Sequence, residues 1–84
     1  MKPGYVEEAL RELRRLGIGS LYEAWKCAEH GDCPPGVEPG EVDSILFMAI
    51  VELEKRGMDP TSEWEQRYIE ETEARERKRV PVPA

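Results

Sequence analysis

The hydrophobic residues of this chain are most concentrated near its middle, in the run Ile45–Val51 followed by Leu53. At about 100° per residue, such a run places hydrophobic side chains around nearly the whole circumference of a helix. One stripe of this helix is formed by Val42, Ile45, Leu46, Ala49, Ile50 and Leu53. Phe47, Met48 and Val51 point to the opposite side. The pattern predicts a central helix with two hydrophobic faces, each of which needs a neighbour.

Two shorter amphipathic helices are predicted before the central one. The first begins near Pro3 or Gly4 and ends at Gly17. The second follows a capping box, in which the Ser20 hydroxyl accepts from the Glu23 backbone N–H and the Glu23 side chain reaches back. The short link between them predicts a helical hairpin that covers the Val42/Leu46 stripe.

A loop and a fourth helix complete the pattern. Residues 31–40 hold three prolines and three glycines and are predicted to form a loop, with Pro39 at the first turn of the central helix. Gly57 ends that helix, and Asp59 caps the next one. The fourth helix is hydrophobic only at its beginning, so we expect a core domain over 1–69 and a charged helical extension with a proline-rich tail over 70–84.

The predicted fold is therefore all-α: a small four-helix domain, with two helical hairpins around a central apolar helix and a charged C-terminal helix extension. The second face of the central helix, with Trp64 and Tyr68 of the fourth helix, forms the candidate interface: Phe47, Met48, Val51, Trp64 and Tyr68. We expect a partner to bury part of this face, most simply another copy in a homodimer. The alternative is that the start of the fourth helix covers it alone.

The charge of the chain is unevenly distributed. The net charge is −6, and residues 23–73 hold fourteen acidic residues against four basic ones. This acidic middle argues against binding of nucleic acid by the body of the domain. A helix-turn-helix interpretation of residues 9–29 also fails, because the second helix lacks the basic or amide side chains that read DNA. The basic segment 74–79 leaves weak nucleic-acid binding through the tail as an alternative.

The cluster Cys27, His30 and Cys33 is the one group of residues with metal-ligand chemistry. Glu23, Cys27 and His30 fall on one predicted helix face, and Cys33 follows shortly after, so these four residues form a candidate Zn²⁺ site. A second pair of ligands, as in most zinc sites, is lacking. Free thiols and a Cys27–Cys33 disulfide are the competing interpretations.

The most consistent function is a small acidic protein-interaction module, regulatory or adaptor in nature or an inhibitor of a basic site, without catalysis. Acidic neighbours would raise the thiol pKa of Cys27, which disfavours a nucleophile. No run has the length of a membrane span or the form of a signal peptide, so a cytoplasmic protein is expected. The absence of asparagine and the single glutamine suggest a thermophilic source.

Overall fold

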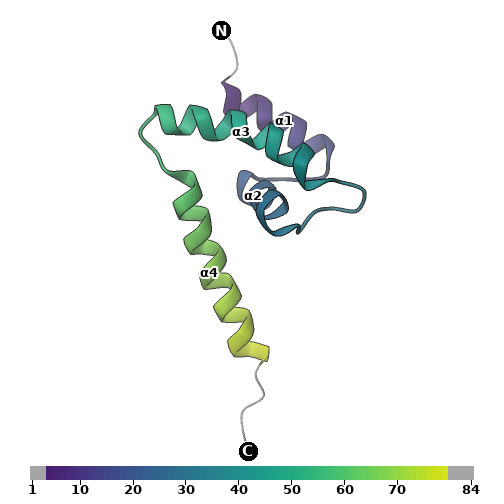
Figure 1. The fold of residues 1–84 in the computed structure, drawn as a ribbon, viewed down its shortest axis with the longest axis vertical. Coiled ribbons are helices and arrows are strands. Elements are labelled where there is room, and N and C mark those ends of the chain that lie inside the picture. The colour runs from purple at the N-terminus through teal and green to yellow at the C-terminus, as the bar shows by residue number, and fades with distance from the viewer. Residues whose placement is uncertain (1–3, 80–84) are drawn as a thin grey trace, which may run out of the picture.

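The fold is all-α, as predicted, with four helices in the described residues and no strand among them. The structure is a computed structural model and describes residues 4–79. In chain order the helices are α1 (Tyr5–Arg15), α2 (Leu21–His30), α3 (Pro39–Lys55) and α4 (Pro60–Arg79). Helices α1 and α2 both pack on α3, whereas α4 leaves the end of α3 and runs away from it as a long arm (Figure 1).

The ends of the helices follow local signals in the sequence. The Ser20 hydroxyl accepts from the Glu23 backbone N–H at 3.2 Å, and the Glu23 carboxylate accepts from the Gly19 N–H, one residue further back than a standard capping box. Gly31 ends α2 in the left-handed conformation with φ 70°, which glycine adopts without steric cost. Asp59 caps α4 by accepting from the Ser62 N–H at 3.4 Å.

The hydrophobic core lies between α1, α2 and α3. Three residues of the predicted α3 stripe, Val42, Leu46 and Ala49, are at most 1% exposed. The first two belong to a continuous buried cluster that consists of Leu13, Ile18, Tyr22, Ala24, Trp25, Cys27, Val42 and Leu46. The prediction that the first two helices cover this stripe is confirmed.

A long-range hydrogen bond fixes the start of α1 against α3. The Glu52 carboxylate accepts from the Val6 N–H at 2.8 Å and is also paired with Arg56 at 3.2 Å. The first N–H groups of a helix have no partner within the helix, and a negative charge there is favourable. Glu52 therefore caps α1 from a distant part of the chain, which the sequence pattern does not reveal.

Helix α4 remains helical through its charged half. The predicted division between residues 69 and 70 falls inside this helix, and the proline-rich tail 80–84 lies outside the described residues. The charged half was expected to have nothing with which to bind the core. Instead Glu71 accepts a hydrogen bond from Tyr22 of α2 at 2.8 Å, so the attachment of α4 extends beyond its hydrophobic start.

Candidate protein-docking site

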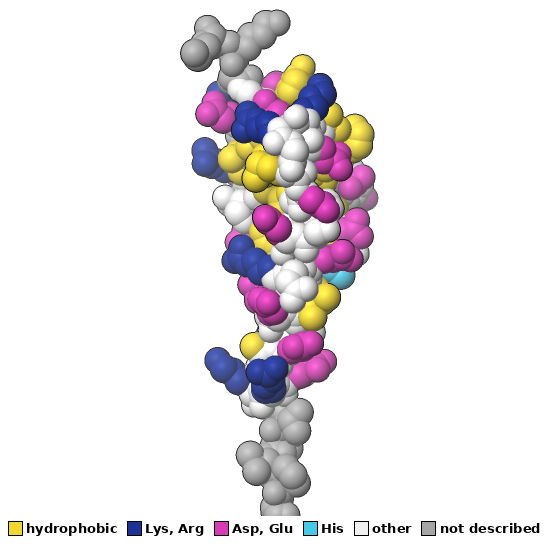
Figure 2. Space-filling model, turned by 90° about the vertical axis from the view of Figure 1, so that its left-hand side faces the viewer, with side chains coloured by type: hydrophobic (Ala, Val, Ile, Leu, Met, Phe, Trp, Pro, Cys, Tyr) yellow, Lys and Arg dark blue, Asp and Glu magenta, His cyan; other side chains and the backbone are white. Residues whose placement is uncertain are grey.

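The outer side of α3 carries exposed hydrophobic side chains. Phe47 is 64% exposed, although its neighbour Leu46 is 1% exposed. Tyr5 at the start of α1 is 55% exposed. On the face drawn in Figure 2, several hydrophobic side chains lie at the surface of the end formed by α1 and α3, and acidic and basic side chains are more frequent further along the molecule. Exposed hydrophobic side chains mark a candidate contact with another molecule when they form a contiguous patch.

These residues line a shallow groove of about 270 Å³, formed by Tyr5, Phe47, Met48, Val51 and Lys55. We call this group the Phe47 face. Met48 and Val51 are half-buried there. Three of the five predicted interface residues therefore lie together. Tyr5 is not among the predicted interface residues, because its spacing of four residues from Ala9 is typical of the inward side of a helix.

The other two predicted interface residues, Trp64 and Tyr68, lie elsewhere, against α2. The Trp25 ring is 6.4 Å from Trp64 and 5.9 Å from Tyr68, measured between centroids. The His30 ring stacks on Tyr68 at 3.9 Å with an interplanar angle of 3°. The start of α4 thus packs on α2 instead of covering Phe47. The alternative prediction, in which the start of the fourth helix alone covers the second face of the central helix, is wrong.

A polar cluster continues this contact between α2 and α4. The Tyr22 hydroxyl donates to Glu71, and Arg67 donates to the same carboxylate at 3.1 Å, with its guanidinium 4.1 Å from the centroid of the Tyr22 ring. Burial, then the hydrogen bond to Glu71, raises the pKa of Tyr22 to about 12. The hydrogen bond from Tyr22 is the main cause that lowers the pKa of Glu71. We call Tyr22, Arg67 and Glu71 the α4 latch.

The four candidate zinc ligands do not come together as a metal site. Cys27 and Cys33 form a disulfide, with 4.5 Å between their Cα atoms. Glu23 is engaged at the start of α2, and the His30 ring is stacked on Tyr68. Within residues 4–79, no three His, Cys, Asp or Glu side chains are placed to hold a metal ion.

The position of Cys27 also corrects the helix face that was predicted for it. Cys27 is 0% exposed and belongs to the core, whereas Glu23 and His30 are exposed. Helix α2 has buried residues on more than one side, since it contacts both α3 and α4. The spacing of Glu23, Cys27 and His30 does not reveal this difference in burial, because it does not show how many sides of α2 are covered.

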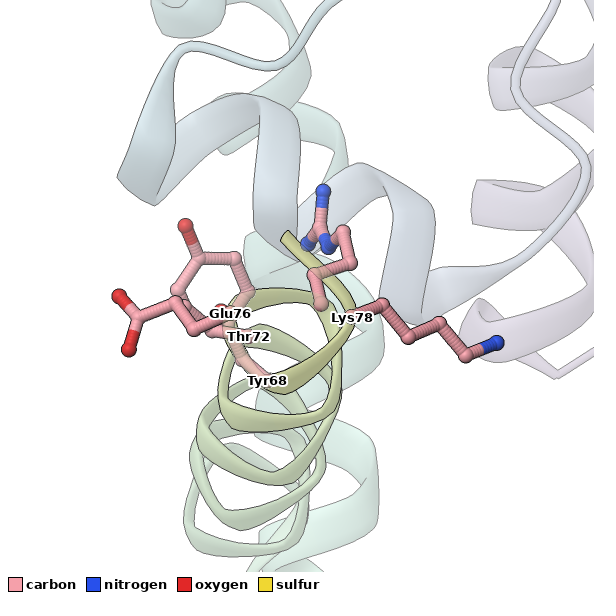
Figure 3. A pocket seen from close by; sticks show the side chains of 5 residues that line it. Tyr68, Thr72, Glu76 and Lys78 are labelled. Atoms are coloured by element: carbon pink, nitrogen blue, oxygen red, sulfur yellow. The ribbon is translucent and has the colours of Figure 1, made fainter. Parts of the chain in front are cut away.

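A larger hollow of about 490 Å³ lies along the end of α4, lined by Tyr68, Thr72, Arg75, Glu76 and Lys78. Figure 3 shows Tyr68 and Glu76 projecting to one side of the helix and Lys78 to the other. The side chains therefore do not converge on one point where a ligand would sit. The Thr72 hydroxyl is buried and has no partner in the described residues.

The basic segment at the end of α4 is interrupted by acidic residues. Arg77 lies 3.9 Å from Glu73, and Glu76 lies between Arg75 and Arg77 in the sequence. A mixed surface of this kind attracts phosphate less strongly than an uninterrupted basic patch. The described part of the segment thus gives little support to the nucleic-acid alternative.

Two further observations bear on the class of protein. None of the helices within residues 4–79 has both the length and the hydrophobicity that crossing a lipid bilayer requires. Comparisons of the chain with protein-family models, with curated proteins and with solved structures find no match, so its function has to be argued from its own residues.

Proposed function

We propose that this protein is a small acidic interaction module that binds another protein through the Phe47 face and has no catalytic activity of its own. The observation that carries the proposal is the exposure of Phe47, which is 64% on a helix that buries Val42, Leu46 and Ala49 on its opposite side. Removing a phenylalanine side chain from water is worth about 1.5–3 kcal/mol. Because Phe47 is 64% exposed, docking on this face would recover at most about two thirds of that free energy.

The composition of the Phe47 face resembles that of protein interfaces. Aromatic residues and methionine are enriched in the cores of interfaces, and a few such anchors supply most of the binding free energy. Tyr5 and Phe47 supply two aromatic rings, and Met48 a flexible side chain that adapts to a partner's surface. Lys55 places a charge at the rim.

The charge of the chain affects which partners would approach. The net charge of −6 favours a basic protein surface through long-range attraction. An adaptor or regulator, or an inhibitor that covers a basic site, is the form of the module that this charge suits. The acidic residues would then increase the association rate, and the hydrophobic anchors would hold the complex together.

A photocrosslinking amino acid placed at position 47 tests the proposal. The full chain, with its disulfide intact, carries benzoylphenylalanine in place of Phe47 and is irradiated both as purified protein and in a cell extract. Ile69 is the matched control position, since it is 48% exposed but lies on α4. We expect crosslinks to protein, either a second copy or a different chain, from position 47 and not from position 69. No crosslink at position 47 in either setting would refute the proposed docking face.

A further inference from the structure

The arrangement of charges along the outer side of α3 identifies one partner for the Phe47 face. We infer that α3 pairs with α3 of a second copy, antiparallel about a two-fold axis between Phe47 and Val51, with Asp43 of each copy facing Lys55 of the other. The inference rests on the proposed function and names the partner of the same face.

The geometry follows from the periodicity of α3. Asp43, Phe47, Val51 and Lys55 follow one another at intervals of four residues, so they form one ridge that crosses the outer side of the helix. The ridge spans twelve residues, which is about 18 Å at 1.5 Å per residue. Its ends carry opposite charges and its middle is hydrophobic.

Such a ridge is complementary to itself when it is reversed. A two-fold axis through its midpoint exchanges each position with the one at equal distance on the other side, so Phe47 of one copy lies over Val51 of the other, and Asp43 over Lys55. Parallel pairing would instead place Asp43 over Asp43 and Lys55 over Lys55, at a cost in repulsion. The charges therefore select the antiparallel arrangement.

The residues beside the ridge are compatible with this pairing. Met48 flanks the ridge on one side and Ile50 on the other, and both are half-buried. The two-fold axis brings each of them toward the same residue of the other copy, so both flanks of the contact are hydrophobic.

Asp43 and Lys55 are available for these contacts. Both side chains are exposed, and neither takes part in an ion pair within the part of the chain that the structure describes. The neighbouring Arg56, in contrast, is already paired with Glu52. Within residues 4–79, Asp43 and Lys55 thus have no ion-pair partner, and an antiparallel copy would pair each of them.

The small size of the surface sets the expected affinity. Stable interfaces bury about 1,200–2,000 Å² in total and involve about 20–30 residues on each side. The proposed contact involves one ridge of α3 with Tyr5 beside it, which is far fewer residues. Two copies also share a net charge of −6 and repel each other at long range, so among the charged side chains only the local pairing of Asp43 with Lys55 favours their association. We therefore expect a weak, reversible dimer in the micromolar range. In an antiparallel pair, the dipoles of the two α3 helices point in opposite directions, which is favourable.

Charge reversal, followed by sedimentation velocity across the micromolar range, tests the pairing. Asp43→Lys and Lys55→Asp each create two like-charge pairs per dimer and are expected to weaken dimerisation about tenfold. The combined variant restores opposite charges and is expected to return the dissociation constant to within about threefold of the parent chain. Phe47→Ser is expected to weaken the dimer at least thirtyfold, about the loss of one interface anchor, and Ile69→Ser to leave it unchanged.

Fluorine NMR provides a second readout that does not depend on these variants. Phe47 is the single phenylalanine of the chain, so fluorophenylalanine labels this face alone. We expect its resonance to shift with protein concentration at the midpoint measured by sedimentation. Far-UV circular dichroism of each variant checks that the helices persist.

Three results would overturn the inference. They are a monomer at all concentrations, a dimer that Phe47→Ser leaves intact, and a combined charge variant as weak as the single ones. A monomer whose position 47 nevertheless crosslinks a different protein would refute the homodimer and leave the proposed function standing. A monomer with no crosslink at position 47 would refute both.

Discussion

The α4 latch is the feature whose removal gives the most informative change in stability. Tyr22→Phe deletes the hydroxyl that donates to Glu71 at 2.8 Å and leaves the ring in place beneath Arg67. A hydrogen bond to a charged group contributes about 1.5–3 kcal/mol. The Glu71 side chain is 39% exposed and keeps its pairing with Arg67, so water and Arg67 compensate for part of the loss. We expect a decrease of about 1 kcal/mol in the free energy of unfolding.

The assay is equilibrium denaturation followed by two probes. Both tryptophans of the chain, Trp25 and Trp64, lie in the contact between α2 and α4, so their fluorescence reports on the docking of α4. Far-UV circular dichroism reports on all four helices. In thermal unfolding a loss of about 1 kcal/mol corresponds to roughly 4–8 °C in a domain of this size. We expect the fluorescence transition of Tyr22→Phe to move by at least as much as the dichroism transition.

An alkaline titration checks the same contact independently. The pKa of Tyr22 is raised to about 12 from an ordinary value of 10.0. Below pH 10 the Tyr22 hydroxyl is protonated in both the folded and the unfolded chain. Above pH 10 the unfolded chain loses this proton first, so the stability that the hydroxyl contributes declines as the pH rises toward 12. We expect phenolate absorbance of the native protein to include a late component that Tyr22→Phe removes.

A matched control separates the latch from ordinary surface ion pairs. Glu73→Gln breaks the exposed pair with Arg77, whose atoms are 3.9 Å apart, and is expected to change stability by less than about 0.5 kcal/mol. Two results would contradict the role of Tyr22: a change in the free energy of unfolding for Tyr22→Phe as small as that for Glu73→Gln, or the absence of a late phenolate component. Either result would mean that Glu71 does not hold α4 to α2 in solution.

Three further changes test other parts of the structure. The Cys27–Cys33 disulfide joins residues that are six positions apart in the sequence. Reducing it increases the conformational entropy of the unfolded chain and is expected to lower the free energy of unfolding by about 2 kcal/mol, measured by urea denaturation with and without reductant. The pKa of Glu71 is lowered from its ordinary value of 4.5, so ionised Glu71 stabilises the fold at a pH above that value. Acidification below pH 4.5 should therefore weaken the docking of α4. The measurement is a change in tryptophan fluorescence while the helical circular dichroism signal persists. Leu46→Ala should cost about 2–5 kcal/mol in thermal unfolding, whereas Phe47→Ala should cost less than about 1 kcal/mol, since only the first side chain is buried.

Much of the fold could be predicted because its signals are local. The capping residues Ser20 and Asp59 and the glycine stop at Gly31 act within a few residues of their position, and the structure has a helix end at each. The buried stripe through Val42 and Leu46 could also be predicted, because a run with helical periodicity determines which side chains share a face. These features require no knowledge of what lies elsewhere in the chain.

The features that could not be predicted depend on how separate helices meet. Glu52 caps α1 across 46 residues of sequence, and the Tyr22–Glu71 hydrogen bond spans 49. Periodicity also failed for Cys27, because its burial results from α2 being covered on more than one side. A one-dimensional pattern can state that a helix has a hydrophobic face, but it cannot state how many neighbours the helix will have.

The direction of α4 decides what remains exposed on α3, and this explains why the five residues of the predicted interface do not lie on one face. Trp64 and Tyr68 are large enough to have covered Phe47, but Trp25 and His30 on α2 offer them aromatic partners at 3.9–6.4 Å. With α4 engaged there, none of the helices described over residues 4–79 covers Phe47 on the outer side of α3. The exposure of Phe47 is thus a consequence of where the aromatic residues of α2 lie. A partner that docks on α3 therefore has no segment of α4 to displace.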